Sequence, residues 1–129
     1  MIYILDAHSW IECYIGSAKG ILLKKLLANK NHKFITLECT LSELKSYCLR
    51  VGIDFNQMFI TLKRNSVFLP VMQENWLQAA EIRHEMKKKI KDFGLIDAIL
   101  IAKQRDLNCS IVSGDPHFKG MKNVVFSGN

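Results

Sequence analysis

The sequence predicts an α/β domain with a mainly parallel central sheet. Short apolar runs of strand length alternate along the chain with longer segments of helical length. The chain has only two prolines, Pro70 and Pro116, and no linker, repeat or low-complexity stretch. We therefore expect one domain over residues 1–129.

In the first half of the chain, the expected strands and helices are apolar segments that end at polar residues or at glycine. Tyr3–Leu5 is apolar and ends at Asp6, so it predicts a buried strand. A helix is expected from Ala7 to Tyr14, stopped near Gly16. The elements expected next are a helix over Ser17–Asn29, a strand over Lys33–Thr36, a helix over Thr40–Arg50 ended by Gly52, and a helix over Phe55–Arg64.

The second half continues the alternation. Ser66–Pro70 predicts a strand stopped by proline, and Gln73–Lys91 a long helix with Trp76, Ala80 and Met86 facing inward. The strongly apolar segment Leu95–Arg105 predicts a buried helix. The last expected elements are a strand over Cys109–Ser113, a turn over Gly114–His117 and a strand over Asn123–Phe126.

Composition and charge exclude several classes of protein. The chain is 49% hydrophobic and 23% charged, as in soluble globular proteins. No apolar run reaches the roughly 18–20 residues of a membrane span, and the N-terminus lacks the pattern of a signal peptide, so we expect a cytoplasmic protein. The four cysteines form no C-x-x-C pair and are expected as reduced core residues. The net charge of +6 permits a nucleic-acid partner without establishing one.

Two acids follow predicted strands. Asp6 comes directly after the first strand, and Asp115 lies two residues after a later one. Functional groups gather at the carboxyl ends of parallel strands, so both are candidates for one site. Helix capping is an equally good explanation of each alone, since Asp6 precedes a predicted helix and Asp115 precedes Pro116.

Two further acids belong to predicted helices. Thr40-Leu-Ser-Glu43 fits a capping box, which offers a structural explanation for Glu43. Asp97 lies near the start of an otherwise apolar helix. The helix dipole stabilises an acid there by about 0.3–1 kcal/mol, whereas an unpaired carboxylate in so apolar a segment costs several times more. Capping therefore explains Asp97 least well.

Together the four acids favour a metal site. Carboxylates held close together repel one another, and a hard divalent cation such as Mg²⁺ or Mn²⁺ removes that repulsion. Such an ion also activates water and orients phosphate, which is the chemistry of phosphodiester hydrolysis.

The same residues resemble the motifs of a known family, the PIN domain, and in particular its small VapC-like toxins. Ile4-Leu-Asp-Ala-His-Ser-Trp-Ile-Glu12 resembles the first motif, Thr40-Leu-Ser-Glu-Leu44 the second, Gly94-Leu-Ile-Asp-Ala-Ile-Leu-Ile-Ala102 the third and Ile111-Val-Ser-Gly-Asp-Pro-His-Phe118 the fourth. The resemblance covers the whole chain. It assigns the second acid to Glu43 and not to Glu38.

The resemblance implies a three-layer α/β/α fold and a Mg²⁺- or Mn²⁺-dependent endoribonuclease, often a dimer and often the toxin neutralised by a small antitoxin. Asp6, Asp97 and Asp115 are then expected as metal ligands, with Glu43 binding metal or positioning the attacking water. The chain departs from the family at His8, where a small polar residue is common. That departure leaves open a rival function, a catalytically inactive PIN-like module that binds another protein.

Two features stay outside the core assignment. The run Lys87-Lys-Lys-Ile-Lys91 is either a solvated helix face or a contact for RNA phosphates. His117 lies in an Asp-x-His-Phe pattern that the family also shows, and we assign it no catalytic role from sequence.

Overall fold

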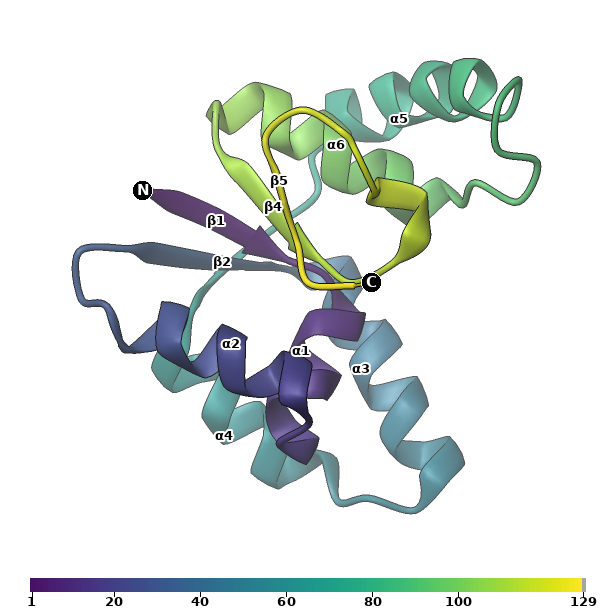
Figure 1. Ribbon diagram of the computed structural model, residues 1–129. Coiled ribbons are helices and arrows are strands. Elements are labelled where there is room, and N and C mark those ends of the chain that lie inside the picture. Colours follow the sequence, from purple (N-terminus) through teal and green to yellow (C-terminus); the bar gives the residue numbers. More distant parts are fainter. Residues whose placement is uncertain (129) are drawn as a thin grey trace.

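The computed structural model describes residues 1–128 and shows an alternating α/β chain (Figure 1). In chain order the elements are β1 (Ile2–Leu5), α1 (Ala7–Ile15), α2 (Ala18–Ala28), β2 (Lys33–Leu37), α3 (Glu38–Val51), α4 (Phe55–Asn65), β3 (Val67–Leu69), α5 (Gln73–Met86), α6 (Leu95–Leu107), β4 (Ser110–Ser113), the 3-10 turn η1 (Pro116–Phe118) and β5 (Val124–Phe126). The predicted alternation is confirmed.

The strands of residues 1–128 form one parallel sheet in the order β3-β2-β1-β4-β5. β1 lies at its centre, where Ile4 pairs with Ile35 of β2 on one side and with Ile111 of β4 on the other. Because all four pairings are parallel, the carboxyl ends of the strands meet at one edge of the sheet.

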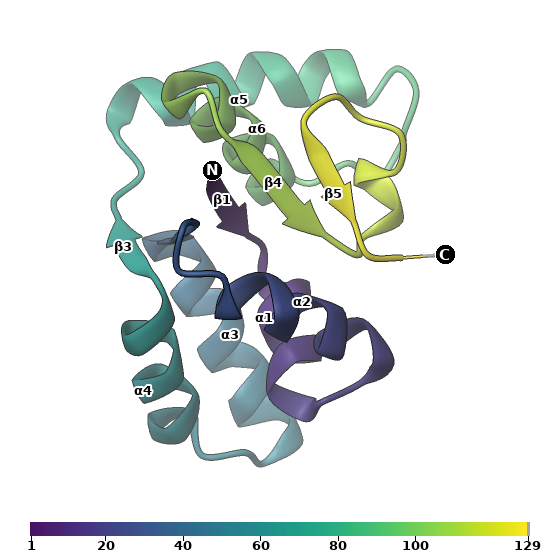
Figure 2. The ribbon, with the colours of Figure 1, turned by 60° about the vertical axis from the view of Figure 1, so that its left-hand side comes forward.

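Helices cover both faces of the sheet, so the fold has the predicted three layers (Figures 1 and 2). Successive strand residues point to opposite faces. Ile4 and Ile111 pack with α5 and α6, whereas Leu5 and Val112 pack with α1, α2, α3 and α4. The buried α6 segment predicted from its apolar sequence lies on the first of these faces.

The helix expected over Gln73–Lys91 is wrong at its C-terminal end. α5 stops at Met86, and the lysine run follows as turns rather than as a helix face. The chain leaves the helix and then buries Phe93 completely in the core with α6. Burying a Phe side chain stabilises by about 1.5–3 kcal/mol, more than the small helix propensity of lysine gives.

The inward face of α5 is also displaced from the prediction. Trp76 and Ala80 are exposed, whereas Met86 is half-buried and packs against the core as predicted. The buried positions are Asn75, Ala79 and Ile82. Because the fully buried Asn75 is polar, the buried face of α5 cannot be recognised from the spacing of apolar residues. Its side chain accepts from the Met72 backbone N–H at 3.0 Å and donates to Asp106, so its polar atoms are satisfied.

The cysteines follow the prediction. Cys13, Cys48 and Cys109 are buried, Cys39 is half-buried, and all four are free thiols. Within residues 1–128 no helix combines the length and the apolar character that crossing a bilayer requires.

Candidate metal centre

Asp6 is the first residue after β1 and caps α1. Its Oδ1 accepts from the Ser9 backbone N–H at 2.8 Å, and its Oδ2 accepts from the Ser113 hydroxyl. The residue is only 7% exposed, and burial raises the pKa of its carboxyl, an effect that the bonds from Ser113 and Ser9 oppose. Capping is thus confirmed for Asp6, but the cap also fixes a carboxylate at the centre of the sheet edge.

Ser113 joins Asp6 to Asp115. It ends β4, which neighbours β1, and is fully buried. Its hydroxyl donates to Asp6 and accepts from the Asp115 backbone N–H at 3.0 Å. Asp115 in turn caps η1 by accepting from the His117 backbone N–H at 2.9 Å. The structure therefore places these two acids at adjacent strand ends, as the sequence predicted.

Asp97 is the third residue of α6 and is better explained by capping than its sequence indicated. Its Oδ2 accepts from the Gly94 backbone N–H at 3.2 Å, the reciprocal bond of a capping box. The side chain remains 19% exposed, so it is not enclosed by the apolar residues that follow it. Local structure therefore accounts for Asp97, and the prediction that capping explains this acid least well is wrong. Its candidacy depends instead on its neighbours.

Glu43 is the opposite case, because its capping-box explanation is wrong. α3 begins at Glu38 and not at Thr40, which is a buried residue of the first turn. Glu43 therefore lies in the second turn, where its side chain caps nothing. Loss of hydration and the charges of Asp6 and Asp97 raise the pKa of the Glu43 carboxyl to about 7. Glu43 is exposed as a whole residue, but the negative charges of Asp6 and Asp97 still act on its carboxyl.

His117 completes the cluster, although no role was predicted for it from its sequence motif. Single ligand atoms of Asp97, Asp115 and His117 all lie within 4.8 Å of one another. The His117 Nδ1 lies 2.9 Å from Asp97 Oδ2 and 3.7 Å from Asp115 Oδ1, and its Nε2 lies 3.1 Å from Asp92 Oδ1. The bond to Asp97 raises the pKa of this imidazole, and the other two carboxylates add to the rise. Its position two residues after Asp115 was the sequence feature that could have indicated that His117 belongs to the site.

These residues fit a divalent cation. The donor set consists of carboxylates and one imidazole, ligand types that Mg²⁺, Mn²⁺ and other divalent ions accept. Burial is the main cause of the raised pKa of Glu43, and repulsion from Asp6 and Asp97 adds to it. A cation among the acids would relieve that repulsion. Asp97, Asp115 and His117 make the closest contacts of the centre, whereas Glu43 interacts electrostatically with Asp97 and with Asp6.

His8 lies beside the centre and not within the close cluster. Its ring packs against Gly114, where an added Cβ would approach the His8 Cδ2 to 2.9 Å. Its Nε2 is 3.7 Å from Glu12 Oε1, and its side chain is 44% exposed. The ring therefore fills space between α1 and the turn that carries Asp115.

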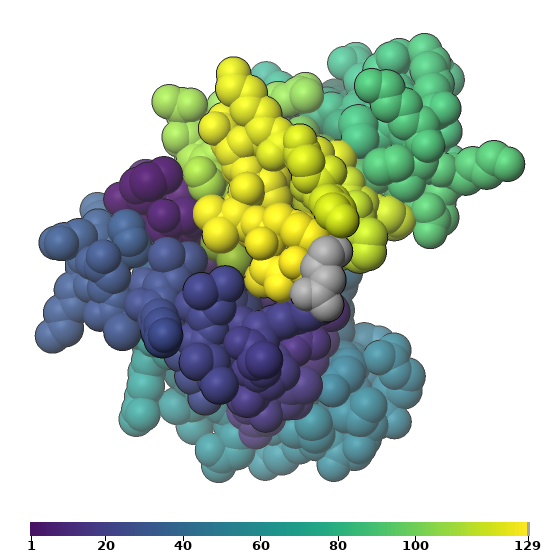
Figure 3. All heavy atoms as spheres, in the orientation of Figure 1, coloured from purple at the N-terminus to yellow at the C-terminus, as the bar shows by residue number. Residues whose placement is uncertain are grey.

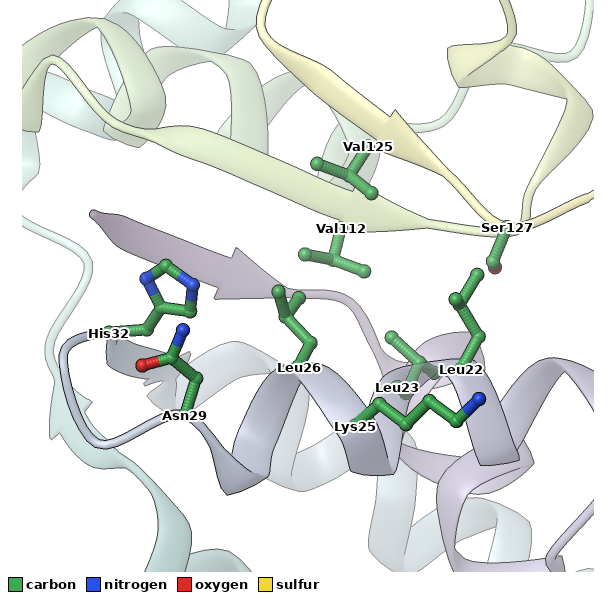
Figure 4. Close-up of a pocket in the computed structure, with 9 residues that line it drawn as sticks. All are labelled: Leu22, Leu23, Lys25, Leu26, Asn29, His32, Val112, Val125 and Ser127. Carbon is green, nitrogen blue, oxygen red and sulfur yellow. The ribbon is translucent and has the colours of Figure 1, made fainter.

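A separate apolar hollow of about 290 Å³ lies between α2 and the sheet (Figure 4). In the space-filling view the C-terminal segment lies next to α2 (Figure 3). Lining residues include Leu22, Leu23, Leu26, Val112 and Val125, and no carboxylate belongs to the lining. The hollow is thus a different surface from the acidic centre.

The chain has clear relatives in sequence pattern and in structure. The model of the PIN domain family matches residues 3–124. No curated protein has significant sequence similarity to this chain.

Several solved structures share the fold over nearly their whole length. A toxin-antitoxin complex from Klebsiella pneumoniae superposes with a TM-score of 0.77 at 15% identity, covering 97% of each chain. VapC20 of Mycobacterium tuberculosis, described as a toxin that cleaves the sarcin-ricin loop, gives 0.72 at 19% identity and covers 95% of this chain and 98% of its own. VapBC2 from Rickettsia felis, bound to a fragment of promoter DNA, gives 0.71 at 20% identity, covering 98% and 97%. At these identities the likeness concerns the fold.

Proposed function

Because this chain belongs to the PIN domain family, we propose that it is a Mg²⁺- or Mn²⁺-dependent endoribonuclease, the toxin of a toxin–antitoxin pair. The observation that carries the proposal is geometric: ligand atoms of Asp97, Asp115 and His117 lie within 4.8 Å of one another, and the Ser113 hydroxyl links Asp6 to Asp115 at the same edge of the sheet. The description of VapC20 as a toxin that cleaves an RNA loop supports RNA as the substrate.

The proposed roles follow from the geometry. Asp97 and Asp115, with Asp6 behind them, would hold the cation by carboxylate oxygens. A bound divalent ion supplies an activated water and balances the charge on the phosphate. Glu43 either contributes a further oxygen or takes the proton from that water, a task suited to a carboxyl whose pKa is about 7.

The lysine run offers a place for the RNA backbone. Asp92, which follows the run directly, pairs with His117 at 3.1 Å, so the segment after α5 is tied to the acidic centre. Lys87, Lys88, Lys89 and Lys91 are exposed in this turn segment. We propose that they neutralise phosphates of a bound single-stranded or loop RNA.

The direct test is Asp97→Asn. Asparagine keeps an oxygen for the Gly94 backbone N–H but lacks the negative charge that holds a cation. The variant is expected to fold as wild type does and to lose metal-dependent RNA cleavage by about 100-fold or more. The matched control is Asp54→Asn, since Asp54 caps α4 and asparagine caps equally well.

The outcomes separate the competing functions. Cleavage by Asp97→Asn at the wild-type rate refutes the assigned site. Absence of cleavage and of Mn²⁺ binding by wild-type protein favours the protein-binding module instead. Parallel reactions on DNA of matched sequence test the choice of RNA.

We propose a small antitoxin and a second copy of this chain as partners. The structural neighbours from Klebsiella pneumoniae and Rickettsia felis are toxin-antitoxin and VapBC assemblies, which supports the first. Co-expression with any small protein encoded beside this gene is expected to yield a complex that no longer cleaves RNA. Light scattering of the purified chain tests for the homodimer.

A further inference from the structure

We infer that His117 supplies a nitrogen ligand to the proposed metal centre, with Asp92 as its positioning residue, so that the centre prefers Mn²⁺ to Mg²⁺. The inference rests on the proposed metal-dependent function and adds a ligand and an ion preference to it. It starts from the contacts that His117 makes at both ring nitrogens.

The spacing of the atoms suits two ligands of one ion. Neighbouring corners of an octahedron with bonds of about 2.1 Å are about 3 Å apart. The His117 Nδ1 is 2.9 Å from Asp97 Oδ2 and 3.7 Å from Asp115 Oδ1. The same side chains therefore reach one cation with little movement.

The second ring nitrogen has the partner that a metal-binding histidine usually has. Histidine ligands commonly direct their other nitrogen to a carboxylate, which fixes the orientation of the ring. The His117 Nε2 lies 3.1 Å from Asp92 Oδ1, whereas Asp97 and Asp115 approach the other nitrogen, Nδ1. Phe93 lies beside the ring, with centroids 5.8 Å apart, and further restricts its rotation.

The ion preference follows from the ligand type. Mg²⁺ prefers oxygen, whereas imidazole nitrogen strengthens binding of first-row transition ions relative to it. A centre with one nitrogen among its carboxylates should thus favour Mn²⁺. If His117 is only an ion-pairing residue that holds η1 against α6, its removal should change Mn²⁺ and Mg²⁺ affinity alike.

The experiment is pulsed electron paramagnetic resonance of Mn²⁺ bound to the full chain without RNA. Coordination through His117 is expected to give electron spin echo modulation from a directly bound ¹⁴N nucleus. The modulation should vanish in His117→Ala and persist in His84→Ala, a histidine on the exposed side of α5. Competition titrations should show that His117→Ala lowers Mn²⁺ affinity about tenfold or more while changing Mg²⁺ affinity less.

Asp92→Asn tests the positioning role. It should keep the ¹⁴N signal while lowering Mn²⁺ affinity by about tenfold. Glu85→Gln, which makes the same change of charge at an exposed residue near α5's end, should not. Equal losses in the two variants would mean that Asp92 acts only through its charge.

Each outcome decides something. Tight Mn²⁺ binding without ¹⁴N modulation, or modulation that survives His117→Ala, overturns the inference and leaves the proposed nuclease function standing. A wild-type chain that binds no Mn²⁺ at millimolar concentration overturns both.

Discussion

Replacement of Glu43 by glutamine should stabilise the metal-free protein at alkaline pH. The folded-state pKa of Glu43 is about 7, above the ordinary 4.5, because burial and two neighbouring acids disfavour its charge. A raised folded pKa contributes stability that is complete below pH 4.5 and is lost as pH rises through about 7. The wild-type chain therefore carries an unfavourable charge at pH 8, and Glu43→Gln removes it.

The size of the effect follows from the pKa. The pKa rises from 4.5 to about 7. Each pKa unit corresponds to about 1.36 kcal/mol, so the destabilisation of the folded state by the Glu43 charge is at most about 3.4 kcal/mol. Solvent screening reduces this because Glu43 is an exposed residue, and we expect a gain of about 1–2 kcal/mol. With an m-value of about 2 kcal/mol/M, the urea midpoint should rise by about 0.5–1 M.

The assay is urea denaturation in EDTA at pH 8 and at pH 5. The gain should be largest at pH 8 and smaller at pH 5, where folded wild-type Glu43 is already protonated. In 10 mM MgCl₂ the gain should shrink, since a bound cation offsets the repulsion in wild-type protein. The control is Glu38→Gln at the start of the same helix, where loss of the favourable helix dipole should cost about 0.3–1 kcal/mol.

One result would refute the reasoning. If Glu43→Gln is no more stable than wild type in EDTA at pH 8, the Glu43 carboxylate is not destabilised by burial and by repulsion from Asp6 and Asp97. Glu43 would then have no electrostatic tie to the acidic centre.

Two further predictions concern the framework of the site. Ser113→Ala removes the hydroxyl that links two acids and should cost about 2–3 kcal/mol in thermal unfolding, together with cleavage activity, whereas Ser113→Thr should keep most of both. Gly20→Ala would place a Cβ 2.0 Å from the backbone oxygen of Glu12, so α1 and α2 must separate. Urea denaturation should show a loss of about 1–3 kcal/mol or more in the free energy of unfolding. Gly52→Ala is the control, because its Cβ meets open space and only the strain of the left-handed backbone, about 1–2 kcal/mol, should lower its stability.

The fold could be predicted from sequence because its strands are buried on both faces. Segments such as Tyr3–Leu5 read as short apolar runs only because helices cover both sides of a parallel sheet. The face of α5 could not be predicted in the same way. Its buried position Asn75 is polar, and its burial is stabilised by the local bond from the Met72 backbone N–H and by tertiary bonds with Asp106 and Lys103.

The order of motifs singled out Asp97 and Glu43, and their role in a metal site stays a prediction. The capping explanations of the two acids, which the structure does test, were predicted the wrong way round. Capping explains Asp97 through the Gly94 backbone N–H, and it does not explain Glu43, because α3 starts two residues before the expected Thr40. Helix starts vary by one or two residues in any sequence pattern, and a capping box depends on the position of a single one.

Capping a helix does not prevent these acids from binding a metal. A carboxylate offers about four lone-pair directions. Asp97 gives its Oδ2, and Asp115 its Oδ1, to a backbone N–H. These bonds fix each side chain while leaving other lone pairs to face the neighbours. Asp6 differs, because both of its oxygens accept hydrogen bonds, from Ser9 and from Ser113. With both Asp6 oxygens occupied by hydrogen bonds, Asp97 and Asp115 have the greater capacity to contact a cation directly.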